Sequence, residues 1–162
     1  MADLTTLEEK LAEVTGLAGA AQEATKKVEG LLDGGSLAEK LRAMREEAEE
    51  TESRCLRIAA ERDGKKIAIE EKARETKSEA TEMMKTYLGE DSDELDGFEF
   101  LTMAEAGEVG HWGVVGTMNQ RAQLPGLQEL VQWVEPIQQR HFQQTLEGSI
   151  ELASDEDPNE PA

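Results

Sequence analysis

The sequence predicts an all-α protein, built as an antiparallel four-helix bundle with an extra helix linking its second and third helices. Apolar residues recur at alternating steps of three and four along four long stretches, which is the spacing of one helix face. Glycine and proline turns separate these stretches. Much of the charge comes from glutamate, which is a good helix former.

The first two helices are predicted from their apolar faces and from the turn between them. The first covers about residues 4–32, and Asp33-Gly34-Gly35 ends it. Ser36 and Glu39 then form an S-x-x-E capping box, which starts the second helix. The first face is formed by Leu4, Leu7, Leu11, Val14, Ala18, Ala21, Thr25, Val28 and Leu32, and the second by Leu37, Leu41, Met44, Ala48, Thr51, Cys55 and Ile58.

The second half of the chain contains three further predicted helices. Residues 65–88 have a thinner apolar face and are expected at the periphery of the bundle. A cap of Asp96 with Glu99 begins a helix over about 97–121. Leu124-Pro125-Gly126 then turns the chain into a last helix that ends near Ala153. Pro136 lies inside this helix, so either the helix bends there, which we favour, or two shorter helices meet.

Length and charge limit the functions that the chain can have. Its 162 residues suit one domain over 1–153, followed by an acidic, proline-containing tail over 154–162 that is expected to be disordered. A formal net charge of −19 disfavours nucleic acid and anionic membranes as partners. Cys55 is the single cysteine, which excludes an intrachain disulfide. The first residues resemble no secretory signal, so we expect a cytoplasmic protein.

Polar residues interrupt the inward faces of the last two helices. Glu108 and His111 lie on a face that is otherwise formed by Leu101, Ala104, Val115 and Met118. Gln138 and His141 interrupt the face formed by Leu127, Val131, Val134 and Thr145. Residues at i, i+3 share a helix face. The first pair lies roughly 18–23 Å before the turn between the helices and the second roughly 22–27 Å after it, so the two pairs are at a similar depth. The sequence therefore predicts that both imidazoles converge inside the protein.

The segment Ala104-Glu-Ala-Gly-Glu-Val-Gly-His-Trp-Gly-Val-Val-Gly-Thr-Met118, followed by Gln138-Gln-Arg-His141-Phe, resembles the last two helices of ferritin-like proteins. It is most similar to a bacterial ferritin-like family linked to stress responses. The resemblance implies an antiparallel bundle and, in metal-binding members, two irons held by carboxylates and histidines. Glu108 and His141 match ligand positions of such members, whereas Gln138 stands where an acid is expected.

Several interpretations of these residues remain open. Glu47 and Glu50 flank the apolar face of the second helix and could turn inward as further ligands. The group could be a buried polar cluster without metal, a site for one iron or zinc ion, or a di-iron centre that oxidises Fe(II) or turns over peroxide. A non-catalytic scaffold, or a coiled-coil hairpin that pairs with another chain as in a homodimer, is the alternative. Hydrolase and nucleotide-binding motifs are missing.

Overall fold

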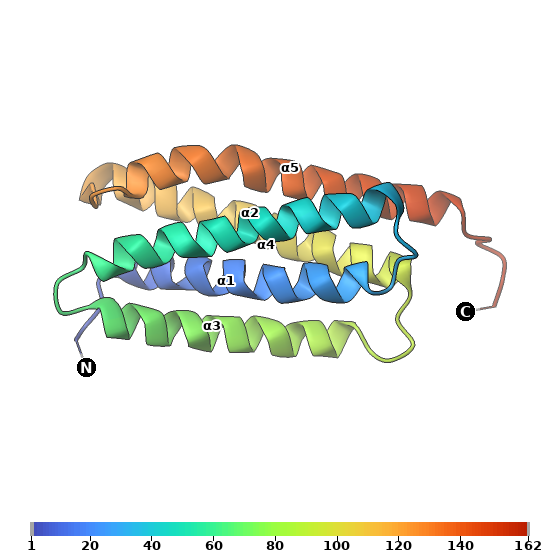
Figure 1. The fold of residues 1–162 in the computed structure, drawn as a ribbon, viewed down its shortest axis with the longest axis horizontal. Helices are drawn as coiled ribbons and strands as arrows, with labels where there is room; N and C mark the ends of the chain where they lie inside the picture. Colours follow the sequence, from blue (N-terminus) through green and yellow to red (C-terminus); the bar gives the residue numbers. More distant parts are fainter. Residues whose placement is uncertain (1, 162) are drawn as a thin grey trace.

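The computed structural model describes residues 2–161, which form five helices and no strand (Figure 1). The all-α prediction is confirmed. Residues 155–161 follow the last helix without helical structure and are exposed to solvent. None of the helices within residues 2–161 has an apolar stretch long enough to cross a membrane. The helices are α1 (Thr6–Glu29), α2 (Gly35–Ala60), α3 (Lys66–Tyr87), α4 (Glu94–Ala122) and α5 (Leu127–Ser154).

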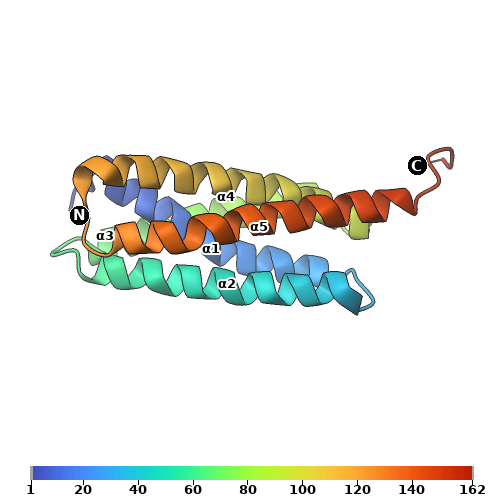
Figure 2. The same cartoon turned by 90° about the horizontal axis from the view of Figure 1, so that it is seen from above.

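Helix α1 lies at the centre of the molecule, and the other helices pack around it. It contacts α2, α3 and α4, while α5 lies across α4 and α2 (Figures 1 and 2). Helices α1 and α2 form one antiparallel hairpin, and α4 and α5 form another. Helix α3 runs along the outer side of α1, as its thin apolar face predicted, and it buries Ala68, Ile69 and Ala73. This placement gives the molecule an additional groove, described below.

The main apolar core has two parts, one toward each end of the helices, and a third, smaller cluster packs α3 against α1 and α2. One part contains Val14, Cys55 and Trp112, and the other contains Met44 and Leu101 together with neighbouring aliphatic and aromatic residues. Between them, the inward faces of α2, α4 and α5 carry polar side chains. The fold thus encloses a polar layer between two apolar ones.

Two predicted helix starts are wrong. Helix α2 begins at Gly35 and not at Ser36, whose predicted cap is absent, because Gly34 and Gly35 adopt φ values of 74° and 86° and turn the chain directly into the helix. Helix α4 begins three residues early, at Glu94, because Asp93 and Asp96 form the capping box.

Helix α5 continues through Pro136 as one helix from Leu127 to Ser154. The alternative of two abutting helices is therefore wrong. Its inward face matches the predicted one, since Leu127, Val134 and His141 are all buried.

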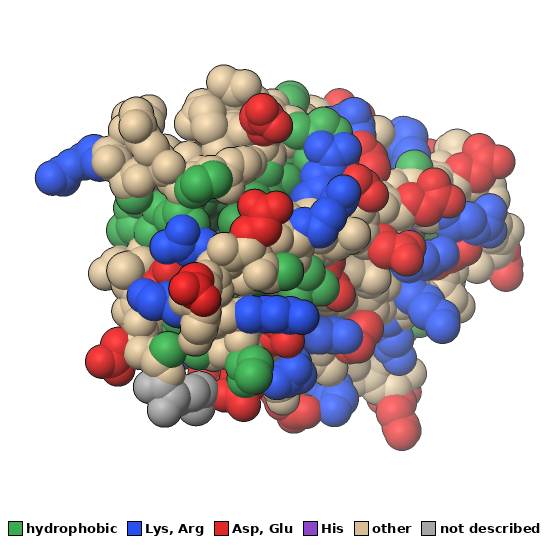
Figure 3. All heavy atoms as spheres, turned by 60° about the vertical axis from the view of Figure 1, so that its left-hand side comes forward, with side chains coloured by type: hydrophobic (Ala, Val, Ile, Leu, Met, Phe, Trp, Pro, Cys, Tyr) green, Lys and Arg blue, Asp and Glu red, His purple; other side chains and the backbone are tan. Residues whose placement is uncertain are grey.

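An ion-pair cluster fixes the start of α1 to the loop between α2 and α3. Glu8 is fully buried and accepts from Arg62 at 3.0 Å, from Lys65 at 2.9 Å and from the Thr5 backbone N–H at 2.8 Å. Burial raises the pKa of Glu8, but the Thr5 amide, Lys65 and Arg62 outweigh it and lower the pKa to about 2. Acidic and basic side chains intermingle over this end of the molecule (Figure 3).

Replacing Glu8 by glutamine is expected to destabilise the protein by about 2 kcal/mol at pH 7, because Arg62 and Lys65 lose their anion. The folded-state pKa of Glu8 lies below its ordinary value of 4.5, so its contribution is full above pH 4.5 and disappears as the pH falls toward 2. Urea unfolding from pH 7 to pH 3 measures this loss. The exposed neighbour Glu9, replaced by glutamine, is the matched control.

Candidate functional site

Five polar side chains meet at the middle of the molecule, and we call them the polar cluster. They are Glu47 of α2, Glu105 and Glu108 of α4, and Gln138 and His141 of α5. The four side chains on α4 and α5 are buried. Each helix brings its members inward because the apolar residues one or two turns away belong to the core.

The polar cluster is a continuous chain of contacts. Gln138 donates its amide N–H groups to Oε2 of Glu105 at 3.1 Å and to Oε2 of Glu108 at 2.8 Å. His141 lies on the other side of Glu105, with Nδ1 at 3.7 Å from its Oε2. Nε2 of the same ring lies 3.2 Å from Oε1 of Glu47. One amide and one imidazole therefore connect three carboxyl groups.

Glu108 favours its protonated form. Burial raises its pKa well above the ordinary value, and the negative charge of Glu105 raises it further. The hydrogen bond from Gln138 acts in the opposite direction but does not compensate. Two adjacent buried carboxyl groups resist carrying two negative charges, so the pair retains a proton.

His141 favours its charged form. Burial lowers its pKa, but the carboxylates of Glu105 and Glu47 outweigh burial and raise it. Burial also raises the pKa of Glu47, but the hydrogen bonds and charges of Arg140 and His141 outweigh burial and lower this pKa below its ordinary value. Glu47 and His141 thus form an ion pair between α2 and α5, with Arg140 as a second cation beside Glu47.

The structure brings together four of the six residues singled out from the sequence. Glu47, Glu108, Gln138 and His141 belong to the polar cluster. Glu50 does not, because it lies at the surface and pairs with Arg54 at 2.7 Å.

His111 also lies outside the polar cluster. Its side chain is 43% exposed, and Nδ1 lies 3.7 Å from Oε2 of Glu13 on α1. The prediction that the two imidazoles converge is therefore wrong. Helix α4 is rotated so that Trp112 enters the core and its neighbour His111 lies at the edge of a groove.

Glu105 is the member that the sequence prediction missed. It is only 2% exposed, and it contacts both Gln138 and His141. A signal was present in its spacing, because Leu101, Glu105, Glu108 and Trp112 follow one another at steps of four, three and four.

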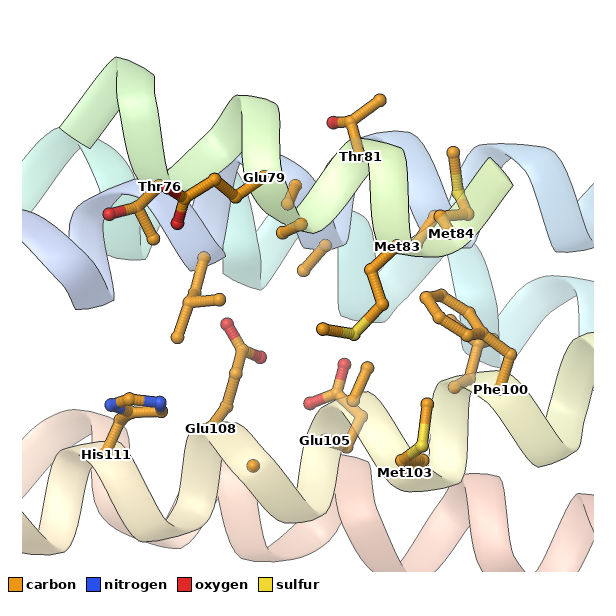
Figure 4. Close-up of a pocket in the computed structure, with 18 residues that line it drawn as sticks. Thr76, Glu79, Thr81, Met83, Met84, Phe100, Met103, Glu105, Glu108 and His111 are labelled. Carbon is orange, nitrogen blue, oxygen red and sulfur yellow. The ribbon is translucent and has the colours of Figure 1, made fainter. Parts of the chain in front are cut away.

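A groove between α1, α3 and α4 opens onto the polar cluster. Its cavity measures about 310 Å³. Glu105 and Glu108 point into it from α4, and Met83 reaches across from α3 (Figure 4). Three carboxyl groups, those of Glu79, Glu105 and Glu108, line the cavity together with His111 and apolar residues. The polar cluster can therefore be reached from this groove.

The geometry does not match a metal centre. Within residues 2–161, no three His, Cys, Asp or Glu side chains are placed to hold one metal ion. The amide nitrogen of Gln138 donates both to Oε2 of Glu105 and to Oε2 of Glu108, so these two oxygens are not free to share a metal ion. Metal binding here requires Gln138 to move and Glu108 to lose its proton.

Comparison with known proteins finds no matching family model, curated protein or solved structure. The geometry of the polar cluster and of the adjoining groove is therefore the basis on which a function is assigned.

Proposed function

We propose that this chain is a ferritin-like helical bundle that binds a small molecule in the groove between α1, α3 and α4. In this proposal α1, α2, α4 and α5 form the four-helix bundle and α3 is the additional helix. The two antiparallel hairpins, and the contacts of α1 with α4 and of α2 with α5, support it. The resemblance of residues 104–118 and 138–142 to ferritin-like helices supports the same bundle.

One observation carries the binding function: an apolar groove ends on two buried carboxyl groups. Ligand sites are mostly apolar concavities of roughly 300–1,000 Å³ with a few polar groups that fix orientation. The groove matches this description, with a cavity of about 310 Å³ and with Glu105 and Glu108 as its polar groups. A cluster that served only to join helices would not require an opening toward solvent.

Filling the groove tests the proposal. Gly107 lines the cavity, and a Cβ at this position would meet nothing within 4 Å, so Gly107→Phe places a ring at the groove without a clash in the helix. Gly113 lies six residues further along α4, is equally free of neighbours and does not line the cavity, so Gly113→Phe is the matched control. Titration with Nile red, an uncharged dye that fluoresces in apolar sites, measures binding.

We expect the unmodified protein and Gly113→Phe to bind the dye equally tightly. Gly107→Phe should bind it at least about tenfold more weakly, because a dye that buries a few methylene-sized groups less in the groove loses that much affinity. Equal binding by all three proteins would contradict the proposal. It would instead favour the non-catalytic scaffold that the sequence also allows.

A second candidate function is divalent metal binding, as in ferritin-like proteins that handle iron under oxidative stress. The observation in its favour is that three carboxyl groups and one imidazole from three helices lie in one chain of contacts. Metal analysis of protein purified without chelator tests it, beside the variant His141→Gln. Stoichiometric iron or zinc that this variant loses would support it. Dimerisation and a cytoplasmic location also stay predictions.

A further inference from the structure

We propose that the ligand of the groove is an organic cation with an apolar body, such as a medium-chain alkylammonium ion, whose charged head binds the carboxyl groups of Glu105 and Glu108 from the cavity side. This inference rests on the proposed binding function and adds the chemical class of the ligand.

Each carboxyl group at the floor of the groove has one oxygen that receives no N–H or hydroxyl donor from the described residues. Oε2 of Glu105 and Oε2 of Glu108 accept from Gln138, while no such donor within residues 2–161 reaches Oε1 of either side chain. Both residues line the cavity, although each is largely buried. Figure 4 shows both carboxyl groups directed into the hollow.

The charge around the groove selects a cation. Its lining contains the carboxyl groups of Glu79, Glu105 and Glu108 and the imidazole of His111, but no lysine or arginine. The nearest cationic ring of the polar cluster, His141, lies behind Glu105 and does not line the cavity. The whole chain carries a formal charge of −19. A carboxylate or phosphate ligand would be repelled here, whereas an ammonium group would be attracted.

The rest of the lining selects an apolar body. Methionine, alanine, leucine and phenylalanine side chains from three helices surround the cavity above the two carboxyl groups. A fully hydrated inorganic cation would leave these surfaces without a partner, while an alkyl chain would bury them at roughly 0.8 kcal/mol per methylene. An alkyl chain of about eight carbons is compatible with a cavity of about 310 Å³.

A series of ligands that differ only in the head group tests the inference. Octylammonium, octanol and octanoate are titrated into the full-length protein by calorimetry at equal ionic strength. We expect octylammonium to bind roughly tenfold or more tightly than octanol, as a charge-assisted hydrogen bond to a buried carboxylate allows, and octanoate not to bind. Ammonium chloride, titrated in the same way, measures non-specific attraction to the acidic surface.

The variant Glu105→Gln removes the negative charge that the pair carries while it keeps the shape of the side chain, because Glu108 favours its protonated form. We expect it to weaken octylammonium binding roughly tenfold and to change octanol binding by less than about twofold. Glu99→Gln, on the exposed side of α4, is the control for a lost surface charge, and thermal unfolding confirms that both variants fold.

The possible outcomes separate the two proposals. If octanol binds as tightly as octylammonium, or if Glu105→Gln leaves octylammonium binding unchanged, the cation is the wrong class of ligand but the groove remains a binding site. If no member of the series binds and Gly107→Phe also has no effect on Nile red, both proposals fail.

Discussion

Replacing Gly16 by alanine is expected to destabilise the protein by about 2 kcal/mol, although alanine is the better helix former. A Cβ at Gly16 would lie 2.4 Å from the backbone oxygen of Ala73 and 2.8 Å from Cβ of Thr76. Both neighbours belong to α3, and the nearest of them is a backbone atom that cannot turn aside. Helix α3 must therefore move away from α1.

The same substitution at Gly110 of α4 should have the opposite effect. A Cβ there meets nothing within 4 Å, so Gly110→Ala is expected to stabilise the protein by about 0.5–1 kcal/mol through helix propensity alone. Urea unfolding followed by circular dichroism measures both variants against the unmodified protein. Equal effects of the two substitutions would show that α3 does not press against α1 at Gly16.

This contact also explains why the groove could not be predicted. The sequence predicts α3 as a helix at the periphery, but its thin apolar face does not say which helix it follows. Gly16 and Gly19 on α1 allow α3 to approach α1 closely. Glycine adds nothing to the periodic pattern of apolar residues, so that pattern does not predict which helix α3 packs against. The groove then forms beyond these glycines, where Met83 and Met84 of α3 face α4.

The inward faces of α2 and α5 could be predicted because the large apolar residues of each helix lie on a single face. Helix α4 offers two choices, which share Leu101, Glu108 and Val115. One adds Ala104, His111 and Met118, and this is the face that the sequence analysis selected. The other adds Phe98, Glu105, Trp112 and Asn119, and the structure buries all four of these residues.

The physical reason for this choice lies in buried area. Phe98 and Trp112 bury far more apolar surface than Ala104 and Met118, and this gain outweighs the cost of enclosing Glu105 beside Gln138 and His141. In the sequence His111 favours the other face, because histidine is a common metal ligand. The two aromatic residues indicate the face that contains Glu105 and leaves His111 outside the polar cluster.

Replacing His141 by glutamine is expected to destabilise the protein by about 3 kcal/mol at pH 6, because it leaves Glu105 and Glu47 without their shared cation. Glutamine retains one hydrogen-bond donor, so the loss reports mainly the charge. Urea unfolding measures the difference between variant and unmodified protein. His111→Gln is the control, and its half-exposed side chain should change the free energy of unfolding by less than about 0.5 kcal/mol.

The pH dependence of this difference identifies the charge on His141. Because the folded-state pKa of His141 lies above its ordinary value of 6.5, its contribution is full below pH 6.5 and disappears as the pH rises through the folded-state pKa. The destabilisation caused by His141→Gln should therefore shrink between pH 6 and pH 9. A difference that stays constant over this range would mean that folding does not shift the pKa of His141, and a difference that grows with pH would mean that the ring is neutral when folded. Glu47 would then lose its buried partner charge, and the negative groove would extend deeper into the polar cluster than we propose.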